Sequence, residues 1–161
     1  MQKPSCQFKI LVLNGPNLGL LGAREPAIYG TATLDGIMRQ LAAYGRARGA
    51  RVEAAQSDVE GVLVERILAA RGVCHGLIVN PAGFTHTSVA LRDALQAAEL
   101  PCVEVHLSNT AARDDFRRRS LTAGACLGQI MGFGPAGYRL ALDGLLEHLA
   151  GSPAANKKGH V

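Results

Sequence analysis

Short apolar runs alternate with longer amphipathic segments along almost the whole chain, and this alternation limits the possible folds more than any other feature. Five runs predict strands, at residues 8–14, 51–56, 76–80, 101–106 and 125–131. Apolar spacing with a helical period predicts helices near residues 33–49, 60–72, 85–99 and 135–150. Continuous apolar strands separated by helices are typical of a parallel sheet covered on both faces. We therefore predict an α/β protein, a three-layer α/β/α sandwich with a five-stranded parallel sheet.

Residues at the ends of the predicted helices agree with this assignment. Thr33 is a suitable N-terminal cap for the first helix, and Thr85 or Thr87 for the third, because their hydroxyls can accept a free backbone N–H. Gly49 and Gly72 follow the first two helices, where glycine commonly ends a helix.

The chain of 161 residues is long enough for one domain with its own core, which we expect over residues 1–150. Residues 151–161, "GSPAANKKGHV", have no periodicity and are mostly small or polar, so we expect a disordered tail. The apolar runs are too short and too interrupted by glycine to span a bilayer, and the first ten residues lack the apolar core of a secretory signal. These features predict a cytoplasmic protein.

Composition argues against several classes of partner and cofactor. The four cysteines have neither the spacing of a redox pair nor that of a metal site, so we expect reduced core residues and no metal. A net charge of +4 would suit nucleic acid, a membrane surface or a small anion, but the 4% of aromatic residues offers few stacking platforms for single-stranded nucleic acid. The four lysines lie near the chain ends, which disfavours a buried Schiff-base lysine.

A group of polar residues follows the predicted strands, on the side where open parallel sheets bind ligands. Ten of these side chains should project toward one rim: Asn17, Arg24, Tyr29, Asn80, His86, Glu104, His106, Ser108, Arg113 and Arg117. Taken alone, each has an ordinary role as a turn former, a solvated charge or a loop anchor. Their number at one edge of the sheet predicts a functional site there.

The loop after the first strand carries no nucleotide-binding motif. Its sequence "GPNLGLLG" lacks both the G-x-G-x-x-G pattern and the Gly-Lys-Ser/Thr ending of a P-loop. The second strand does not end in an acidic residue that would hold a ribose hydroxyl. A dinucleotide or a nucleoside triphosphate is therefore disfavoured as the ligand.

Three stretches, "LNGPNLGLLGAREPAIYG", "NPAGFTHTSVALRDAL" and "VEVHLSNTAARDDFRRRSL", resemble the signature sequences of the type II 3-dehydroquinate dehydratases, or type II dehydroquinases. The resemblance extends over about residues 8–148. It implies a flavodoxin-like fold and a lyase that reversibly eliminates water, with anti geometry, from 3-dehydroquinate to give 3-dehydroshikimate through an enolate. This reaction serves the shikimate pathway and aromatic amino acid biosynthesis, or quinate breakdown. The family needs no metal or cofactor and assembles as a homododecamer, a tetramer of trimers.

The resemblance also implies roles for the residues of the predicted rim. Tyr29 would be the base, and the guanidinium of Arg24 would lower the pKa of its phenol from an ordinary value of about 10. The segment from Gly19 to Gly30 would close over the substrate and exclude water. His106 would be the general acid, with its ring oriented by Glu104.

Further residues would bind the intermediate and the substrate. By the same resemblance, Asn17 would hold a water molecule or the enolate oxygen. The substrate carboxylate would meet Asn80 and the backbone amides near Leu107 and Ser108.

The ring hydroxyls of the substrate would meet His86 and Arg117, with help from Arg113. Asp93 would reach the site of an adjacent subunit in the trimer. An ordinary helix-surface pair of Asp93 with Arg92 or a neighbouring turn is the alternative, and the residues alone do not decide between the two.

One loop departs from the family pattern, since "SDVEG" stands where the family often has "SNSEG". We expect Asp58 and Val59 to affect packing of this loop more than activity, because the loop supports the site and does not carry its chemistry. Two alternatives to the enzyme remain: a flavodoxin-like module that binds a flavin, a phosphate or another small ligand, and an inactive descendant of the enzyme. The absence of a Ser/Thr-rich phosphate loop disfavours the first, and the presence of Tyr29, Arg24 and His106 disfavours the second.

Overall fold

The computed structural model describes residues 6–23 and 32–152, and within them a five-stranded sheet in the order β2-β1-β3-β4-β5. All four neighbouring pairs of strands are parallel. The strands are β1 (Phe8–Asn14), β2 (Ala50–Gln56), β3 (Gly76–Asn80), β4 (Cys102–His106) and β5 (Gly128–Met131). This is the flavodoxin-like strand order. The predicted fold class and number of strands are confirmed.

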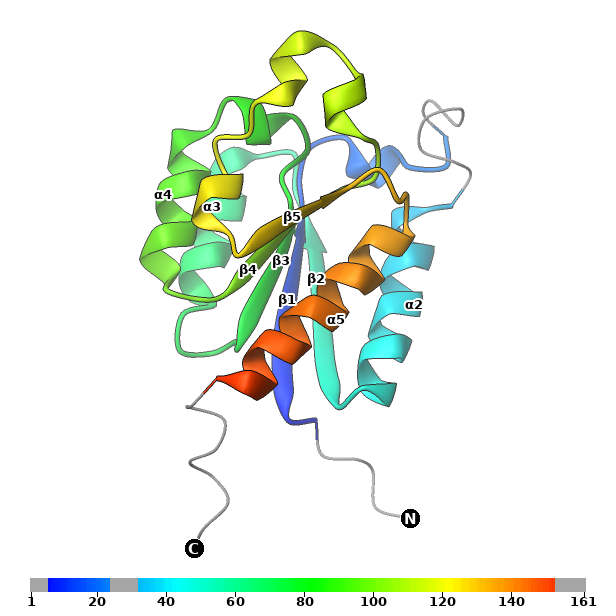
Figure 1. Ribbon diagram of the computed structural model, residues 1–161, viewed down its shortest axis with the longest axis vertical. Helices are drawn as coiled ribbons and strands as arrows, with labels where there is room; N and C mark the ends of the chain where they lie inside the picture. Colours follow the sequence, from blue (N-terminus) through cyan, green and yellow to red (C-terminus); the bar gives the residue numbers. More distant parts are fainter. Residues whose placement is uncertain (1–5, 24–31, 153–161) are drawn as a thin grey trace, which may run out of the picture.

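Two helices cover each face of the sheet, as Figure 1 shows. Helices α2 (Leu34–Ala47) and α5 (Ala136–Gly151) pack on one face, and α3 (Glu60–Ala69) and α4 (Val89–Ala98) on the other. Each face buries its own cluster of apolar side chains, which explains why the central strands are apolar on both sides. None of these helices, nor any other in the described part of the chain, is long and apolar enough to cross a membrane.

Short 3-10 helices shape the loops around the sheet. At the carboxyl ends of the strands, η1 (Leu18–Leu20) follows β1, η2 (Ala82–His86) follows β3, and η3 (Thr110–Ala112) and η4 (Asp115–Arg118) follow β4. A fifth, η5 (Ala123–Ala125), comes before β5. The observed strand β5 therefore begins three residues after the start of the predicted range 125–131. The first residues of that range belong to η5 and to the turn after it.

The helix ends follow the predictions in part. Thr33 caps α2, because its Oγ1 accepts the Gly36 N–H at 3.2 Å. Gly49 and Gly72 have φ angles of +75° and +71°, the left-handed conformation expected of glycines that end helices.

The predicted cap at Thr85 or Thr87 is wrong. Ser88 caps α4 instead, since its hydroxyl accepts the Leu91 N–H at 2.9 Å. The segment before it forms η2, and this turn directs the Thr85 hydroxyl into the protein toward Glu104.

The loops after β1 and β3 are drawn together at the point where the strand order reverses. The Gly15 N–H donates to the Asn80 carbonyl oxygen at 2.7 Å. A side chain at position 15 would collide with the Pro81 carbonyl oxygen, so glycine is required for this close approach. Asn80, at the end of β3, and the loop that carries Asn17 are therefore held close together.

Two predictions fall partly outside the described residues. The tail predicted at 151–161 is described only at residues 151 and 152. The loop predicted to close over a ligand, Gly19 to Gly30, is described only as far as residue 23.

Candidate active site

A pocket of about 200 Å³ lies at the carboxyl edge of the sheet, where β1, β3 and β4 end. This is the position at which doubly wound sheets bind ligands, and the volume suits a small molecule. Eight of the predicted site residues line it: Asn17, Asn80, His86, His106, Leu107, Ser108, Arg113 and Arg117. These residues are far apart in the sequence, and they lie together because the carboxyl ends of parallel strands meet at one edge of the sheet.

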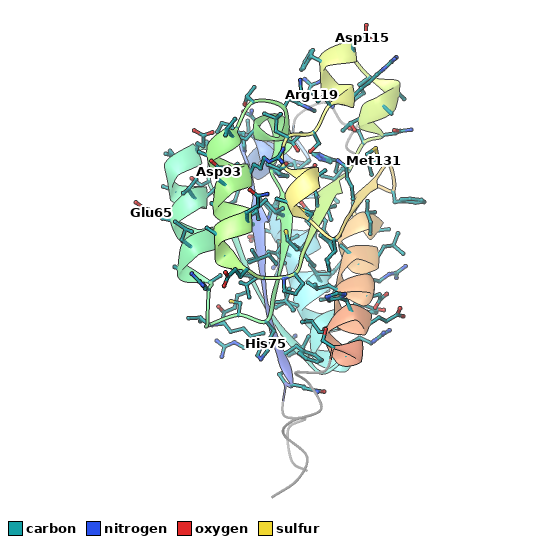
Figure 2. All side chains as sticks on the ribbon, turned by 60° about the vertical axis from the view of Figure 1, so that its left-hand side comes forward. Glu65, His75, Asp93, Asp115, Arg119 and Met131 are labelled. Atoms are coloured by element: carbon teal, nitrogen blue, oxygen red, sulfur yellow. The ribbon has the colours of Figure 1, made fainter. Side chains whose placement is uncertain are left out.

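Four predicted site residues are not among the described residues that line the pocket. Arg24 and Tyr29 lie outside the described part of the chain. Glu104 is fully buried behind His106. Asp93 is exposed on α4, where Figure 2 shows it on the outer helical layer, and it makes no hydrogen bond or ion pair with another described residue. The alternative pairing of Asp93 with Arg92 is therefore absent from this structure.

Asn17 is held in an unusual backbone conformation by a residue whose function the sequence did not reveal. Its φ angle is +65°, in the left-handed region that asparagine tolerates better than most residues. Its N–H donates to Asp58 Oδ1 at 2.8 Å, and Gln56 Nε2 donates to the same oxygen at 2.9 Å. Asp58 therefore fixes the backbone of Asn17. The only signal for this role was the unusual aspartate in "SDVEG".

A buried chain of hydrogen bonds fixes the side chain of Asn80. Asn80 Nδ2 donates to the Tyr138 hydroxyl at 3.0 Å, and Asn80 Oδ1 accepts the Ala82 N–H at 3.2 Å. Tyr138 in turn donates to Asn14 Oδ1 at 2.6 Å. Burial raises the pKa of Tyr138, so its hydroxyl stays protonated and donates. One N–H of the Asn80 amide remains for a ligand in the pocket.

His106 and Glu104 form a buried pair beneath the pocket. They lie two residues apart on β4, so both side chains point to the same face of the sheet. His106 Nε2 is 2.7 Å from Glu104 Oε1, and the side chains are 6% and 0% exposed. Since Nε2 faces the carboxylate, Nδ1 is the ring nitrogen that can serve a ligand. The predicted orientation of His106 by Glu104 is present in this geometry.

Glu104 is surrounded by hydrogen-bond donors. Burial on its own raises the pKa of the carboxyl, but hydrogen bonds from His106, Thr122 and Thr85, together with the charge of His106, lower it to about 2. Glu104 is therefore an anion throughout the physiological range. The hydroxyl residues around it were not predicted as part of the site.

His86 and Arg117 form one wall of the pocket. His86 Nδ1 is 2.8 Å from the Arg119 carbonyl oxygen, so Nδ1 carries the proton and Nε2 is left for a ligand. The guanidinium of Arg117 lies over the Phe116 ring at 4.7 Å, and its Nε donates to Asp114 Oδ2 at 3.2 Å. The side chain of Arg117 is thus positioned before any ligand binds.

The wall after β4 suits a negatively charged ligand group. Leu107 and Ser108 directly follow the strand and line the pocket. Arg113 approaches the same place, because its guanidinium donates to the Ser108 hydroxyl at 3.4 Å. A guanidinium beside backbone amides favours binding of a carboxylate.

Comparisons with known proteins agree with this geometry. The sequence model of the family described as Dehydroquinase class II matches residues 8–146. A 3-dehydroquinate dehydratase from Ruegeria pomeroyi is 55% identical over 141 residues, which cover 88% of this chain and 95% of the relative.

Two solved structures are also similar. The type II dehydroquinase from Propionibacterium acnes has a TM-score of 0.84 and 45% identity, over 91% of this chain and 98% of its own. The type II dehydroquinase from Butyrivibrio crossotus has a TM-score of 0.84 and 40% identity, over 86% of this chain and 97% of its own. With the fold, the pocket and the family match in agreement, the chain belongs to the class II dehydroquinases.

Proposed function

We propose that the pocket catalyses the reversible anti elimination of water from 3-dehydroquinate, which gives 3-dehydroshikimate through an enolate. The protein is then a hydro-lyase of the shikimate pathway. The observation that carries the proposal is the buried pair of His106 and Glu104 beside Asn17, in a chain that belongs to this family. The family match and the activity named for the Ruegeria relative favour the enzyme over a binding module or an inactive descendant.

The first step removes a proton beside the substrate carbonyl, and we assign it to Tyr29. The sequence contains three tyrosines, and the other two are committed elsewhere. Tyr44 donates to Asp143 Oδ1 at 2.9 Å, and Tyr138 is fully buried with its hydroxyl bonded to Asn14. Arg24, five residues before Tyr29, would stabilise the phenolate.

The second step expels the hydroxyl of the enolate intermediate as water. His106 donates the proton to the departing hydroxyl, while the Glu104 anion stabilises the charged form of its ring. Asn17, with its backbone fixed by Asp58, holds a water molecule or the enolate oxygen. The substrate gives one proton to Tyr29 and receives one from His106 with the departing hydroxyl, so it loses one water molecule. Before the next turnover Tyr29 releases its proton to solvent and His106 takes one up.

Substrate binding follows from the charges of the pocket walls. The free N–H of Asn80 and the amides near Leu107 and Ser108 would bind the carboxylate, with the cation of Arg113 beside them. His86 Nε2 and the Arg117 guanidinium would bind the ring hydroxyls.

We extend the proposal to the assembly and the location of the protein. The exposed Asp93 carboxylate, without a partner in the described part of its own chain, suits a role in the site of an adjacent subunit within a dodecamer of trimers. The free cysteines, among them Cys74, Cys102 and Cys126 in or beside the core, suit the reducing cytoplasm.

The test follows the ultraviolet absorbance of the conjugated enone product when 3-dehydroquinate is added to purified, metal-stripped protein. We expect a rise with the wild type and with Tyr44→Phe, a matched change at a tyrosine bonded to Asp143, and no rise with Tyr29→Phe. A folded wild-type protein that gives no rise would contradict the proposed function. A fully active Tyr29→Phe variant would contradict the assigned base.

A further inference from the structure

The carboxylate of Glu104 is enclosed by four uncharged donors from different parts of the fold. Thr85 on η2 and Thr122 before η5 donate to it at 2.7 and 2.6 Å. Ser120 donates at 3.0 Å, and the side-chain amide of Gln129 on β5 donates at 2.8 Å. We call Thr85, Ser120, Thr122 and Gln129 the Glu104 cradle. None of the four lines the pocket.

The hydroxyl protons of the cradle favour an anion at its centre. Each of the three hydroxyls has one proton to donate, and all three also lie within 2.7–3.3 Å of one another. An ionised Glu104 has lone pairs for the protons of all three hydroxyls. A neutral Glu104 would bring a further proton and accept fewer bonds.

The donors to Glu104 are concentrated on the oxygen that faces His106. Oε1 receives Thr85, Ser120, Gln129 and His106, and Oε2 receives Thr122. This crowding of donors on Oε1 favours the ionised carboxylate over transfer of the His106 proton to it. A hydrogen bond with Cys126 and burial raise the pKa of the Cys102 thiol well above its ordinary value, so this neighbouring thiol carries no charge beside Glu104.

We propose that Thr85, Ser120, Thr122 and Gln129 are positioning residues that hold Glu104 as a fixed anion, so that it orients the His106 ring for proton transfer. The proposal deepens the proposed function and rests on the role of His106 as the general acid. The cradle acts on the reaction through Glu104 and touches neither the substrate nor the departing hydroxyl.

The cradle also connects the acid to the wall that would bind the substrate hydroxyls. The Leu121 N–H donates to the Thr85 carbonyl oxygen at 2.7 Å, and His86 is bonded to the Arg119 carbonyl oxygen. Two hydrogen bonds thus join the segment of residues 119–122 to η2, next to the cradle residues Thr85, Ser120 and Thr122. Figure 2 shows Arg119 at this junction, above the sheet.

The kinetic test compares Thr122→Val with Thr122→Ser. Valine keeps the volume of threonine and removes the hydroxyl, whereas serine keeps the hydroxyl and removes a methyl group. We expect Val to lower kcat about tenfold or more with KM changed less than about threefold, and Ser to retain most of kcat, because a hydrogen bond to a charged group is lost only in Val. Equal losses in both variants would mean a purely structural role and would overturn the proposal.

Gln129→Met repeats this test at a partly exposed position on the edge strand β5. It removes one donor and should also lower kcat more than it changes KM. An unchanged kcat in both Thr122→Val and Gln129→Met would overturn the proposal. If Thr122→Val does not fold, the result for Gln129→Met decides.

An infrared measurement reads the charge of Glu104 independently of activity. The spectrum of the wild type minus that of Glu104→Gln isolates this carboxyl, whose ionised and neutral forms absorb separately. In the wild type we expect the band of the ionised carboxylate from neutral pH down to about pH 3. In Thr122→Val the carboxylate should convert to the neutral carboxyl at a higher pH than in the wild type, because one donor is lost. A neutral band at pH 7 would overturn the proposal. Normal turnover by His106→Asn would refute the proposed acid and leave the infrared result for the cradle intact.

Discussion

Because the cradle lowers the pKa of Glu104, this residue makes the free energy of unfolding depend on pH below about 4.5. The substitution Glu104→Gln should remove this contribution. The pKa of Glu104 is about 2 in the folded protein against an ordinary value of 4.5. A lowered pKa stabilises the fold above pH 4.5, and the stabilisation is lost as the pH falls from 4.5 toward 2. The difference of about 2.5 units corresponds to about 3 kcal/mol, of which about 2 kcal/mol is lost by pH 3.

The measurement is urea unfolding followed by far-ultraviolet circular dichroism at pH 6 and pH 3, since the chain has no tryptophan. Protein concentration is held fixed, because dissociation of an oligomer would shift the midpoint. We expect the wild type to lose about 2 kcal/mol more than Glu104→Gln between the two pH values. Glu65→Gln, a change at an exposed carboxylate on α3, should behave as the wild type. Equal losses in wild type and Glu104→Gln would refute the reasoning.

Two further predictions concern residues that support the pocket. Tyr138→Phe removes the hydroxyl that joins Asn14 to Asn80 and leaves a buried acceptor without its donor, so the free energy of unfolding should fall by about 2 kcal/mol in urea denaturation. A change below about 0.5 kcal/mol would contradict this account of the buried chain. Asp58→Ala removes the acceptor that fixes the Asn17 N–H and should lower kcat about tenfold, whereas Asp58→Asn keeps an acceptor oxygen and should retain most activity in steady-state assays. Wild-type kinetics in Asp58→Ala would mean that other contacts hold the backbone of Asn17 in its strained conformation.

The central strands β1 and β3 could be predicted closely because apolar residues on both of their faces pack in the core. The bounds of β1 and β3 coincide with the predicted ranges, since apolar residues on both faces leave one continuous signal. The edge strand β5 differs. It is only four residues long and partly exposed, and the apolar residues before it form a 3-10 turn, which local hydrophobicity does not distinguish from a strand.

The site could be predicted where it depends on topology and not where it depends on long-range contacts. Asn17, Asn80 and His106 converge because parallel strands end at one edge. The roles of Asp58 and Thr85 depend on partners 41 and 19 residues away, at distances that loop conformations set. Thr85 even matched the pattern of a helix cap, because a threonine before a helix is the same local signal whether its hydroxyl points outward or inward.

The paired polar groups at the carboxyl edge imply that much of the site is organised before substrate arrives. Among the described residues, no buried side-chain nitrogen or oxygen lacks a hydrogen-bond partner. Of the three described non-glycine residues with positive φ angles, Asn17 and Ala82 line the pocket, and Glu99 ends α4. The backbone of Asn17 is held by the Asp58 side chain and that of Ala82 by the Asn80 side chain. Because ordering of these groups is completed during folding, substrate binding does not have to supply it. Loss of a supporting contact should therefore appear first in kcat, through misplaced reacting groups, and only weakly in KM.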